Sequence, residues 1–322
     1  SIHSRSRISI LAFPQSVFDF NCHRVKLENI SMNIRNRPAR LRRVQLSVPG
    51  SSEKMLQKAA GSDADHVFCD LEDAVAPSAK PGARELIATA LNELDWGKKT
   101  RCVRINDVTT QWCHDDIITL VEKAGKNIDT IMLTKPRSAS DVMFLHLMLD
   151  QLEQKLGLKR RIGIEVLIEE VEALQNVEAI ATCSDRMEWL IFGMGEGGDY
   201  PGDIFHYARF RVTMAARAAG LDAVDGPFSN FKNQEAYSAQ AIQARSLGMA
   251  GKWAIHPAQI EWAINVFTPE AEAVAHARKL EAAYREAEAN GLGAAQVDGA
   301  MIDAATVRLV RNTLIKADLI GM

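Results

Sequence analysis

Three residues with side chains suited to catalysis lie in or directly after apolar segments of the chain. Glu165 interrupts the apolar run of residues 161–170, Asp199 ends a glycine-rich segment, and Arg104 lies in another short apolar run. A buried carboxylate is costly unless it is paired or holds a metal. Two carboxylates from neighbouring strands could bind one hard divalent cation such as Mg²⁺. A nearby arginine would present a fixed guanidinium to a carboxylate or a developing oxyanion.

Each of these residues also has a purely structural interpretation. Glu165 could form a salt bridge with an arginine at a strand end, and Asp199 could be a solvated acid in a surface loop. Arg104 could form a structural ion pair with Asp70 or Glu72. The order of the surrounding elements decides between these roles.

Strand-like and helix-like segments alternate from residue 43 onward, in eight strand–helix units at roughly 30-residue spacing. This order predicts an α/β fold, a (β/α)8 TIM barrel with a C-terminal helical extension. A doubly wound open sheet is the alternative, but no glycine fingerprint follows the first strand. The predicted strands are residues 44–48, 66–71, 101–105, 129–134, 161–170, 188–192, 221–224 and 251–255. The predicted helices are residues 51–60, 79–94, 115–124, 139–156, 171–181, 205–219, 234–247 and 257–267.

Polar side chains follow most of the predicted strands. Barrel enzymes place their chemistry at this carboxyl-terminal edge, on the loops after the strands. We therefore expect the active site there. The polar residues are Asp70, Glu72, Asp73, Arg104, Asn106, Lys135, Glu165, Glu196, Asp199, Asp225 and His256.

Composition excludes several classes of function. The 322 residues are 47% hydrophobic and 25% charged, with a net charge of -3. This balance is typical of a soluble globular protein and argues against nucleic-acid binding. No apolar run approaches the roughly 20 residues that cross a membrane. Five scattered cysteines without a C-x-x-C motif favour reduced thiols in the cytoplasm over disulfides or a zinc site.

Three regions are predicted along the chain. Residues 1–43 are an atypical Arg- and Ser-rich extension outside the fold, either a transit peptide or an added segment before Met32 as the initiator. Residues 44–268 form the catalytic barrel. Residues 269–322 form the helical extension, which could cap the barrel or reach a neighbouring subunit.

Several motifs occur together in one order and spacing. They are VPGS (residues 48–51), DLEDAV (70–75), VRIN (103–106), EV (165–166), IHP (255–257), DWG (95–97), VDGPF (224–228) and GMAGKWAIHP (248–257). With these motifs the chain resembles the citrate lyase β-subunit-like (HpcH/HpaI aldolase/citrate lyase) family of barrel lyases over about residues 41–320. It is most similar to the malyl-CoA/β-methylmalyl-CoA lyase branch.

The resemblance implies an Mg²⁺-dependent lyase, with Mn²⁺ as an alternative cation. It would reversibly cleave a 3-hydroxyacyl-CoA such as malyl-CoA or β-methylmalyl-CoA to acetyl- or propionyl-CoA and glyoxylate, a 2-oxo acid. By similarity, Glu165 and Asp199 ligate the metal, Arg104 steadies the oxyanion, and Asp73 supports the metal's water shell. Asp303 matches an acid that reaches a neighbour's active site, which implies a homotrimer or hexamer. The residues assigned to substrate and CoA binding are Lys58, Ser51, Pro227, Asp70 and Glu72.

Alternatives stay open at this point. The loop after the sixth strand departs from the family pattern, and an ungapped alignment puts Glu196 in place of Asp199 as the second metal ligand. The reaction could instead be citryl- or citramalyl-CoA cleavage, or thioester hydrolysis of malyl-CoA. The chain could also be a non-catalytic or complex-bound citrate lyase β-like subunit.

Overall fold

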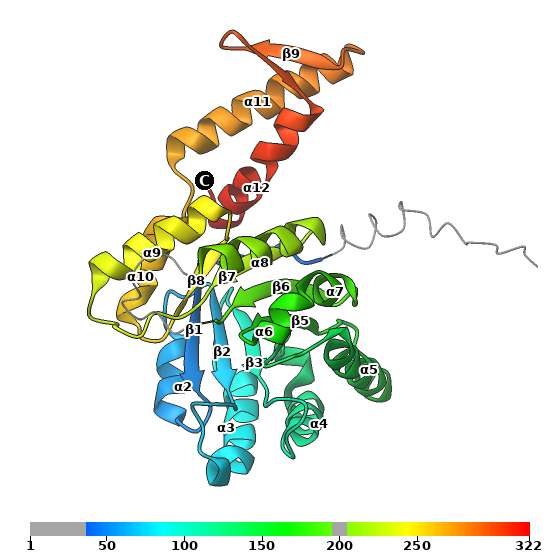
Figure 1. Ribbon diagram of the computed structural model, residues 1–322, viewed down its shortest axis with the longest axis vertical. Coiled ribbons are helices and arrows are strands. Elements are labelled where there is room, and N and C mark those ends of the chain that lie inside the picture. Colours follow the sequence, from blue (N-terminus) through cyan, green and yellow to red (C-terminus); the bar gives the residue numbers. More distant parts are fainter. Residues whose placement is uncertain (1–36, 195–204) are drawn as a thin grey trace, which may run out of the picture. The chain divides into compact units, whose positions relative to one another are not determined.

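The computed structural model describes residues 37–194 and 205–322, and eight parallel strands in this part of the chain close into a barrel (Figure 1). Each strand pairs with the next along the sequence, and β8 pairs with β1. The predicted (β/α)8 fold is confirmed. The strands are β1 (Val44–Pro49), β2 (His66–Asp70), β3 (Thr100–Arg104), β4 (Thr130–Leu133), β5 (Gly163–Ile168), β6 (Met187–Phe192), β7 (Asp222–Asp225) and β8 (Gly251–Ala254).

Helices follow the strands and surround the barrel, close to the predicted ranges. They are α2 (Glu53–Ala60), α3 (Lys80–Glu93), α4 (Cys113–Ala124), α5 (Ala139–Leu156), α6 (Val171–Gln175), α7 (Val177–Thr182), α8 (His206–Ala218), α9 (Gln234–Leu247) and α10 (Ala258–Phe267), with 3₁₀ turns at Pro77–Ala79 and Gly125–Asn127. One prediction was wrong: the single helix expected over 171–181 is two short helices. Asn176 interrupts it with a ψ of 11°, outside the helical range.

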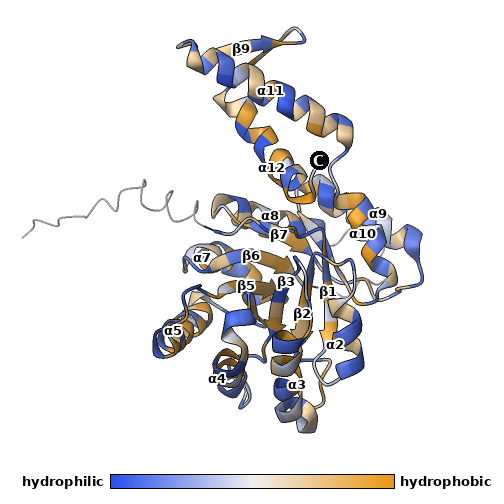
Figure 2. Ribbon diagram, turned by 180° about the vertical axis from the view of Figure 1, so that it is seen from behind, coloured by the Kyte–Doolittle hydropathy of each residue, from blue (hydrophilic) through white to orange (hydrophobic). Residues whose placement is uncertain are grey.

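Hydrophobic residues fill two separate spaces in the barrel. Alternate residues of a strand point to opposite faces, so Val67 and Cys69 of β2 pack outward against the helices while Phe68 points into the barrel. The strands are accordingly mostly apolar in Figure 2. The inner cluster consists of Phe68, Cys102, Met132, Leu167, Trp189, Ile191, Val224 and Trp253. Polar side chains lie on the same inward face on either side of this layer.

The C-terminal region is not wholly helical. Helices α11 (Ala271–Ala289) and α12 (Ala304–Ile320) pack against each other and are joined by a hairpin of β9 (Ala294–Val297) and β10 (Ala300–Asp303) (Figure 1). Leu280, Val297 and Ile302 form the small core of this unit. None of the described helices combines the length and apolarity that a membrane crossing requires.

Residues 37–43 contact the barrel, although they were predicted to lie outside the fold. Arg43 pairs with Asp65 at 2.8 Å, and Arg40 pairs with Glu188 at 3.0 Å. Part of the segment assigned to the extension therefore packs on the barrel.

Candidate active site

A large cavity opens at the carboxyl-terminal edge of the strands, where the active site was expected. Its volume is about 1210 Å³. One part is lined by acidic and basic side chains at or just after the ends of β2, β3 and β5, and another by lysines of α2. Its lining includes Ser47, Pro49, Lys54, Met55, Lys58, Asp70, Asp73, Arg104, Leu167, Glu169, Gly193, Pro227, Trp253 and His256.

Arg104 forms a two-point ion pair with Asp70 in the wall of this cavity. Arg104 Nε lies 2.7 Å from Asp70 Oδ1, and a terminal nitrogen lies 2.6 Å from Oδ2. Backbone N–H groups of Glu72 and Ala74 also donate to Asp70, at 2.8 and 3.1 Å. Burial opposes the charge on Arg104, but Asp70 and Glu72 outweigh burial and raise the pKa of the guanidinium. The structural ion pair therefore exists, and the guanidinium still faces the cavity.

Lys135 brings a second cation to the same acidic loop. Its ammonium bonds to Glu72, and lies 3.3 Å from Asp73 Oδ1. Glu72 is 5% exposed and receives Arg104 on its other oxygen at 3.2 Å. Burial raises the pKa of Glu72, and the two cations only partly offset this effect.

Buried hydrogen bonds from Lys80 and Asn106 hold the backbone of the Asp70–Asp73 loop in place. Lys80 Nζ donates to the carbonyl oxygens of Leu71 and Glu72, at 2.7 and 2.8 Å, and to Asn106 Oδ1 at 2.6 Å. Asn106 in turn donates to Leu71 O and to Asp116 Oδ2. Lys80 stands nine positions after Leu71, on the following helix, and its role was missed because an isolated lysine in a helix gives no signal.

Gly50 lets the turn after β1 pass close to this loop. A Cβ atom there would lie 2.4 Å from Ile87 Cδ1 and 2.7 Å from Asp70 O. The N–H of Gly50 donates to Asp70 O at 2.8 Å. A side chain at this position would displace the strand end that carries Asp70.

Glu169 is the carboxylate that β5 presents to the cavity. It follows the last strand residue, Ile168, and its Oε1 accepts a hydrogen bond from the backbone N–H of Lys135 at 2.9 Å. Burial raises the pKa of Glu169 to about 7, and the neighbouring Glu72 carboxylate adds to this effect. An acid held this close to other acids is suited to binding a cation.

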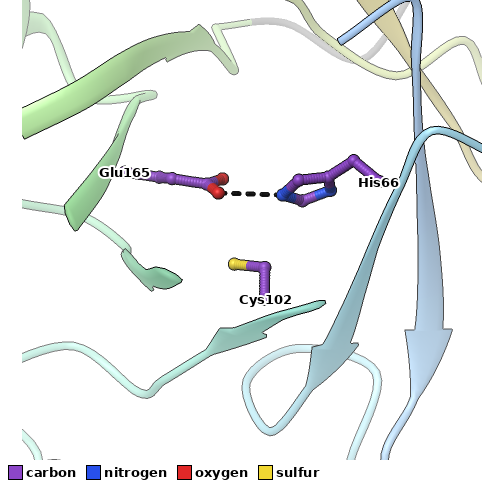
Figure 3. Close-up of side chains that lie close together, drawn as sticks. All are labelled: His66, Cys102 and Glu165. Atoms are coloured by element: carbon purple, nitrogen blue, oxygen red, sulfur yellow. Dashed lines mark hydrogen bonds and ion pairs between the residues drawn. The ribbon is translucent and has the colours of Figure 1, made fainter. Parts of the chain in front are cut away.

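Glu165 lies elsewhere, in the interior of the barrel. It is fully buried and accepts hydrogen bonds from His66 Nε2 at 2.8 Å and from Thr130 Oγ1 at 2.5 Å (Figure 3). Residues 165, 167 and 169 share the inward face of β5, and Leu167 and Glu169 line the cavity while Glu165 does not. Glu169 lies four residues further along the chain than Glu165, which corresponds to roughly 13 Å along a strand. Of the two acids on this face, Glu169 therefore faces the cavity and Glu165, the predicted metal ligand, lies in the interior.

The interior group around Glu165 and the carboxylates around Glu169 differ in the metal that they could hold. His66, Cys102 and Glu165 have ligand atoms within 4.8 Å of one another (Figure 3). This set of an imidazole, a thiol and a carboxylate suits zinc or a related transition metal. Burial, however, raises the pKa of the Cys102 thiol well above its usual value and so disfavours the thiolate that a metal binds. Mg²⁺ prefers oxygen ligands alone. The carboxylates around Glu169 meet that preference, and the interior triad does not.

The remaining predicted site residues divide between the cavity and other regions. Lys58 and Pro227 line the cavity, but Ser51 is not part of the lining, where the neighbouring Ser52 takes its place. Asp303 lies on the C-terminal hairpin, where its carboxylate caps α12 by accepting from Thr306 N at 2.9 Å. Asp199 and Glu196 fall outside the described residues.

Comparison with known proteins assigns the chain to a family. A sequence profile of the HpcH/HpaI aldolase/citrate lyase family matches residues 43–257. The L-malyl-CoA/beta-methylmalyl-CoA lyase of Cereibacter sphaeroides is 38% identical over 308 residues, which cover 88% of this chain and 97% of that protein. A (3S)-malyl-CoA thioesterase of the same species is 34% identical over 283 residues, covering 86% and 94%.

A solved structure agrees with this assignment. The crystal structure of CitE from Mycobacterium tuberculosis, in complex with magnesium, acetoacetate and coenzyme A, matches with a TM-score of 0.65 and 26% identity, over 85% of this chain and 97% of that one. The chain belongs to the HpcH/HpaI aldolase/citrate lyase family, and the predicted resemblance is confirmed. It is a carbon–carbon lyase of the citrate lyase type.

Proposed function

We propose that this protein is an Mg²⁺-dependent lyase that reversibly cleaves a 3-hydroxyacyl-CoA ester to a shorter acyl-CoA and a 2-oxo acid. Malyl-CoA and β-methylmalyl-CoA are the proposed substrates, with glyoxylate as the oxo acid and acetyl-CoA or propionyl-CoA as the other product. Relatives named for these substrates over almost their whole length support the proposal. The observation that carries it is the position of Glu169, an acid beside Glu72 and Arg104 at the wall of the cavity.

Glu169 would hold the metal from the end of β5. The second ligand would come from the segment after β6, the next strand of the barrel, where Asp199 and the alternative Glu196 lie. When bound, Mg²⁺ would polarise the carbonyl of the oxo acid and fix its carboxylate. Mn²⁺ has the same ligand preference and would serve as a substitute.

Arg104 would stabilise the oxygen that becomes negative during cleavage. The 3-hydroxyl gives up its proton as it becomes the carbonyl of the oxo acid. The electron pair of the broken carbon–carbon bond passes to the thioester, which is an enolate until its carbon takes a proton. Arg104 has five N–H donors, and the contacts to Asp70 and Glu72 leave donors for a substrate oxygen in the cavity. Because Asp70 fixes its plane, the guanidinium needs no reorganisation when the charge appears.

The size of the cavity suits a substrate that carries a long cofactor. Ligand cavities commonly measure about 300–1,000 Å³, and this one is about 1210 Å³. Lys54 and Lys58 line the part of the cavity on α2, where their ammonium groups would meet the phosphates of CoA. Asp303, which lies outside this cavity, would act in the cavity of a second copy within a homotrimer or hexamer.

One second function has a specific observation in its favour. A relative that is 34% identical over 86% of this chain is named (3S)-malyl-CoA thioesterase. The same cavity could therefore release CoA by adding water to the thioester instead of breaking the carbon–carbon bond. Both reactions need the thioester carbonyl beside a fixed cation.

An assay with two readouts separates these functions. Purified protein is given malyl-CoA with Mg²⁺ or with EDTA, glyoxylate is trapped as its phenylhydrazone, and free CoA thiol is measured separately. Glyoxylate that appears only with Mg²⁺ supports the lyase. Free CoA without glyoxylate supports the thioesterase, and neither product from the folded protein would contradict both proposals.

A further inference from the structure

Lys135 contacts three carboxylates through two different parts of the residue. Its ammonium bonds to Glu72 and lies 3.3 Å from Asp73, while its backbone N–H donates to Glu169 Oε1 at 2.9 Å. Its φ of 49° is in the left-handed region, which non-glycine residues seldom adopt. A conformation that carries a cost is retained where the surrounding contacts require it. Here it directs the N–H and the ammonium toward the same acidic group.

Four carboxylates and two side-chain cations make up this group. The rim carboxylates are Asp70, Glu72, Asp73 and Glu169, and the cations are Arg104 and Lys135. Arg104 occupies both oxygens of Asp70 and one oxygen of Glu72. Lys135 occupies the other oxygen of Glu72 and contacts Asp73.

Among the described residues, Glu169 has no ion-pair partner, whereas the other three rim carboxylates pair with Arg104 or Lys135. It keeps one neutral hydrogen bond, which orients the carboxylate but does not neutralise it. The group as a whole carries two more negative than positive charges when all its acids are ionised, which a single divalent cation would balance.

We propose that Lys135 is a positioning residue that keeps Glu72 and Asp73 off the bound cation, so that Glu169 alone of the rim carboxylates ligates it. This inference rests on the Mg²⁺ site proposed above. Mg²⁺ has six coordination positions in an octahedron. If Glu72 and Asp73 also bound it, they would join Glu169 and the second ligand proposed above, and only the two positions that a bidentate 2-oxo acid requires would be left, with none for water. Lys135 thereby leaves the positions that Glu72 and Asp73 would take to exchangeable water, which the substrate can displace.

Two variants of Lys135 test this role with Mn²⁺ as the probe. Lys135→Met removes the ammonium and keeps the backbone N–H, and Lys135→Arg keeps a positive charge. Electron paramagnetic resonance measures free Mn²⁺ and hence affinity, and water-proton relaxation reports how many exchangeable waters remain on the bound ion. Lys54→Met is the matched control, because it removes a lysine from the same cavity that contacts none of the rim carboxylates.

In Lys135→Met, a freed carboxylate would replace water on the cation. We expect Mn²⁺ to bind about tenfold more tightly, because one nearby positive charge is gone. We also expect a smaller relaxation enhancement per bound ion, and weaker binding of glyoxylate to the Mn²⁺ complex. Lys135→Arg and Lys54→Met should stay within about threefold of the wild type in affinity, with unchanged relaxation.

The outcomes distinguish this inference from the proposed function. Wild-type protein that binds no Mn²⁺ or Mg²⁺ would overturn the metal site itself, and with it the proposed function. Wild-type protein that binds Mn²⁺, with Lys135→Met folded and unchanged in affinity and relaxation, would overturn only the role of Lys135. Circular dichroism and a thermal scan establish that each variant is folded.

Discussion

Arg104 and Asp70 are joined twice, once through their side chains and once through the strands that carry them. Their Cα atoms are register partners between β3 and β2, and their side chains form two hydrogen bonds of 2.7 and 2.6 Å. The parallel ladder therefore sets the distance over which the ion pair forms. This relationship fixes the guanidinium at the cavity before any substrate binds.

Replacing Arg104 by lysine tests whether this fixed geometry matters for catalysis. Lysine keeps the charge but cannot make the two parallel hydrogen bonds to Asp70. We expect Arg104→Lys to fold and to lose activity by about a hundredfold or more, as for the loss of an oxyanion donor elsewhere. Turnover of malyl-CoA is the measurement. Activity within threefold of the wild type would show that Arg104 is only structural.

Glu169 and Glu165 should behave in opposite ways when each is changed to glutamine. Glu169→Gln removes the rim acid, so we expect Mn²⁺ affinity to fall at least tenfold with the fold retained. Glu165→Gln weakens the buried bonds to His66 and Thr130, so we expect a loss of about 1–3 kcal/mol of unfolding free energy and unchanged Mn²⁺ affinity. Mn²⁺ titration and chemical denaturation of both variants are the measurements. Loss of Mn²⁺ binding in Glu165→Gln alone would return the ligand role to Glu165.

The stability of the metal-free protein should depend on pH through Glu169. Burial raises the pKa of this acid from 4.5 to about 7 in the folded chain. Its neutral form is therefore favoured by folding, and this contribution, complete below pH 4.5, is lost as the pH rises through 7. In EDTA, the melting temperature of the wild type should fall relative to that of Glu169→Gln between these pH values. Parallel melting curves over this range would contradict the environment assigned to Glu169.

Gly50→Ala should disturb the loop that holds Asp70. The new Cβ would lie 2.4 Å from Ile87 Cδ1 and 2.7 Å from Asp70 O. We expect a loss of about 1–3 kcal/mol of unfolding free energy, as for other overpacked sites, with reduced activity. Gly61→Ala is the control, since its nearest contact would be 3.9 Å. Equal stability of the two variants would show that the turn can move away.

Mixing two inactive variants tests the proposed action of Asp303 in a second copy. Asp303→Asn keeps an intact cavity and Arg104→Ala keeps an intact Asp303, so neighbouring subunits could complete each other's site. After unfolding and refolding together in equal amounts, we expect about a quarter of the sites to be active in a ring of random order. No recovery from the mixture would mean that Asp303 does not act between subunits.

The barrel could be predicted from the chain because its signals are local. Buried strands such as 163–168 read as apolar runs, and helices with clear ends, such as Ala139–Leu156, have a capping serine before them and a glycine after them. The hairpin between α11 and α12 was missed, since Ala294–Val297 and Ala300–Asp303 are too short and too weakly apolar to stand out.

The sequence predicts which face of a strand a side chain lies on, but not how far along the barrel axis it lies. Alternation along β5 places residues 165, 167 and 169 on one face, but it does not say which of them reaches the rim. Glu165 was chosen because it interrupts the apolar run, and Glu169 was overlooked because an acid at a strand end looks like an ordinary boundary. Its position directly after the last buried residue, Ile168, was the available signal.

The contacts of Lys135 and Lys80 with the acidic loop are set by tertiary structure alone. Lys135 is separated from Glu72 by 63 positions, and its left-handed φ has no sequence signal in the dipeptide that it forms with Pro136. Such contacts depend on the register of neighbouring strands and on the helix that follows them.

The most direct test of the proposed reaction is proton NMR of malyl-CoA treated with the wild-type protein in D₂O. Carbon–carbon cleavage through an enolate predicts equal amounts of glyoxylate and acetyl-CoA, with one solvent deuterium in each new methyl group. It also predicts that neither product appears in EDTA and that both return when Mg²⁺ is added in excess. Malate and free CoA as the products, or products formed equally well in EDTA, would contradict the Mg²⁺-dependent lyase.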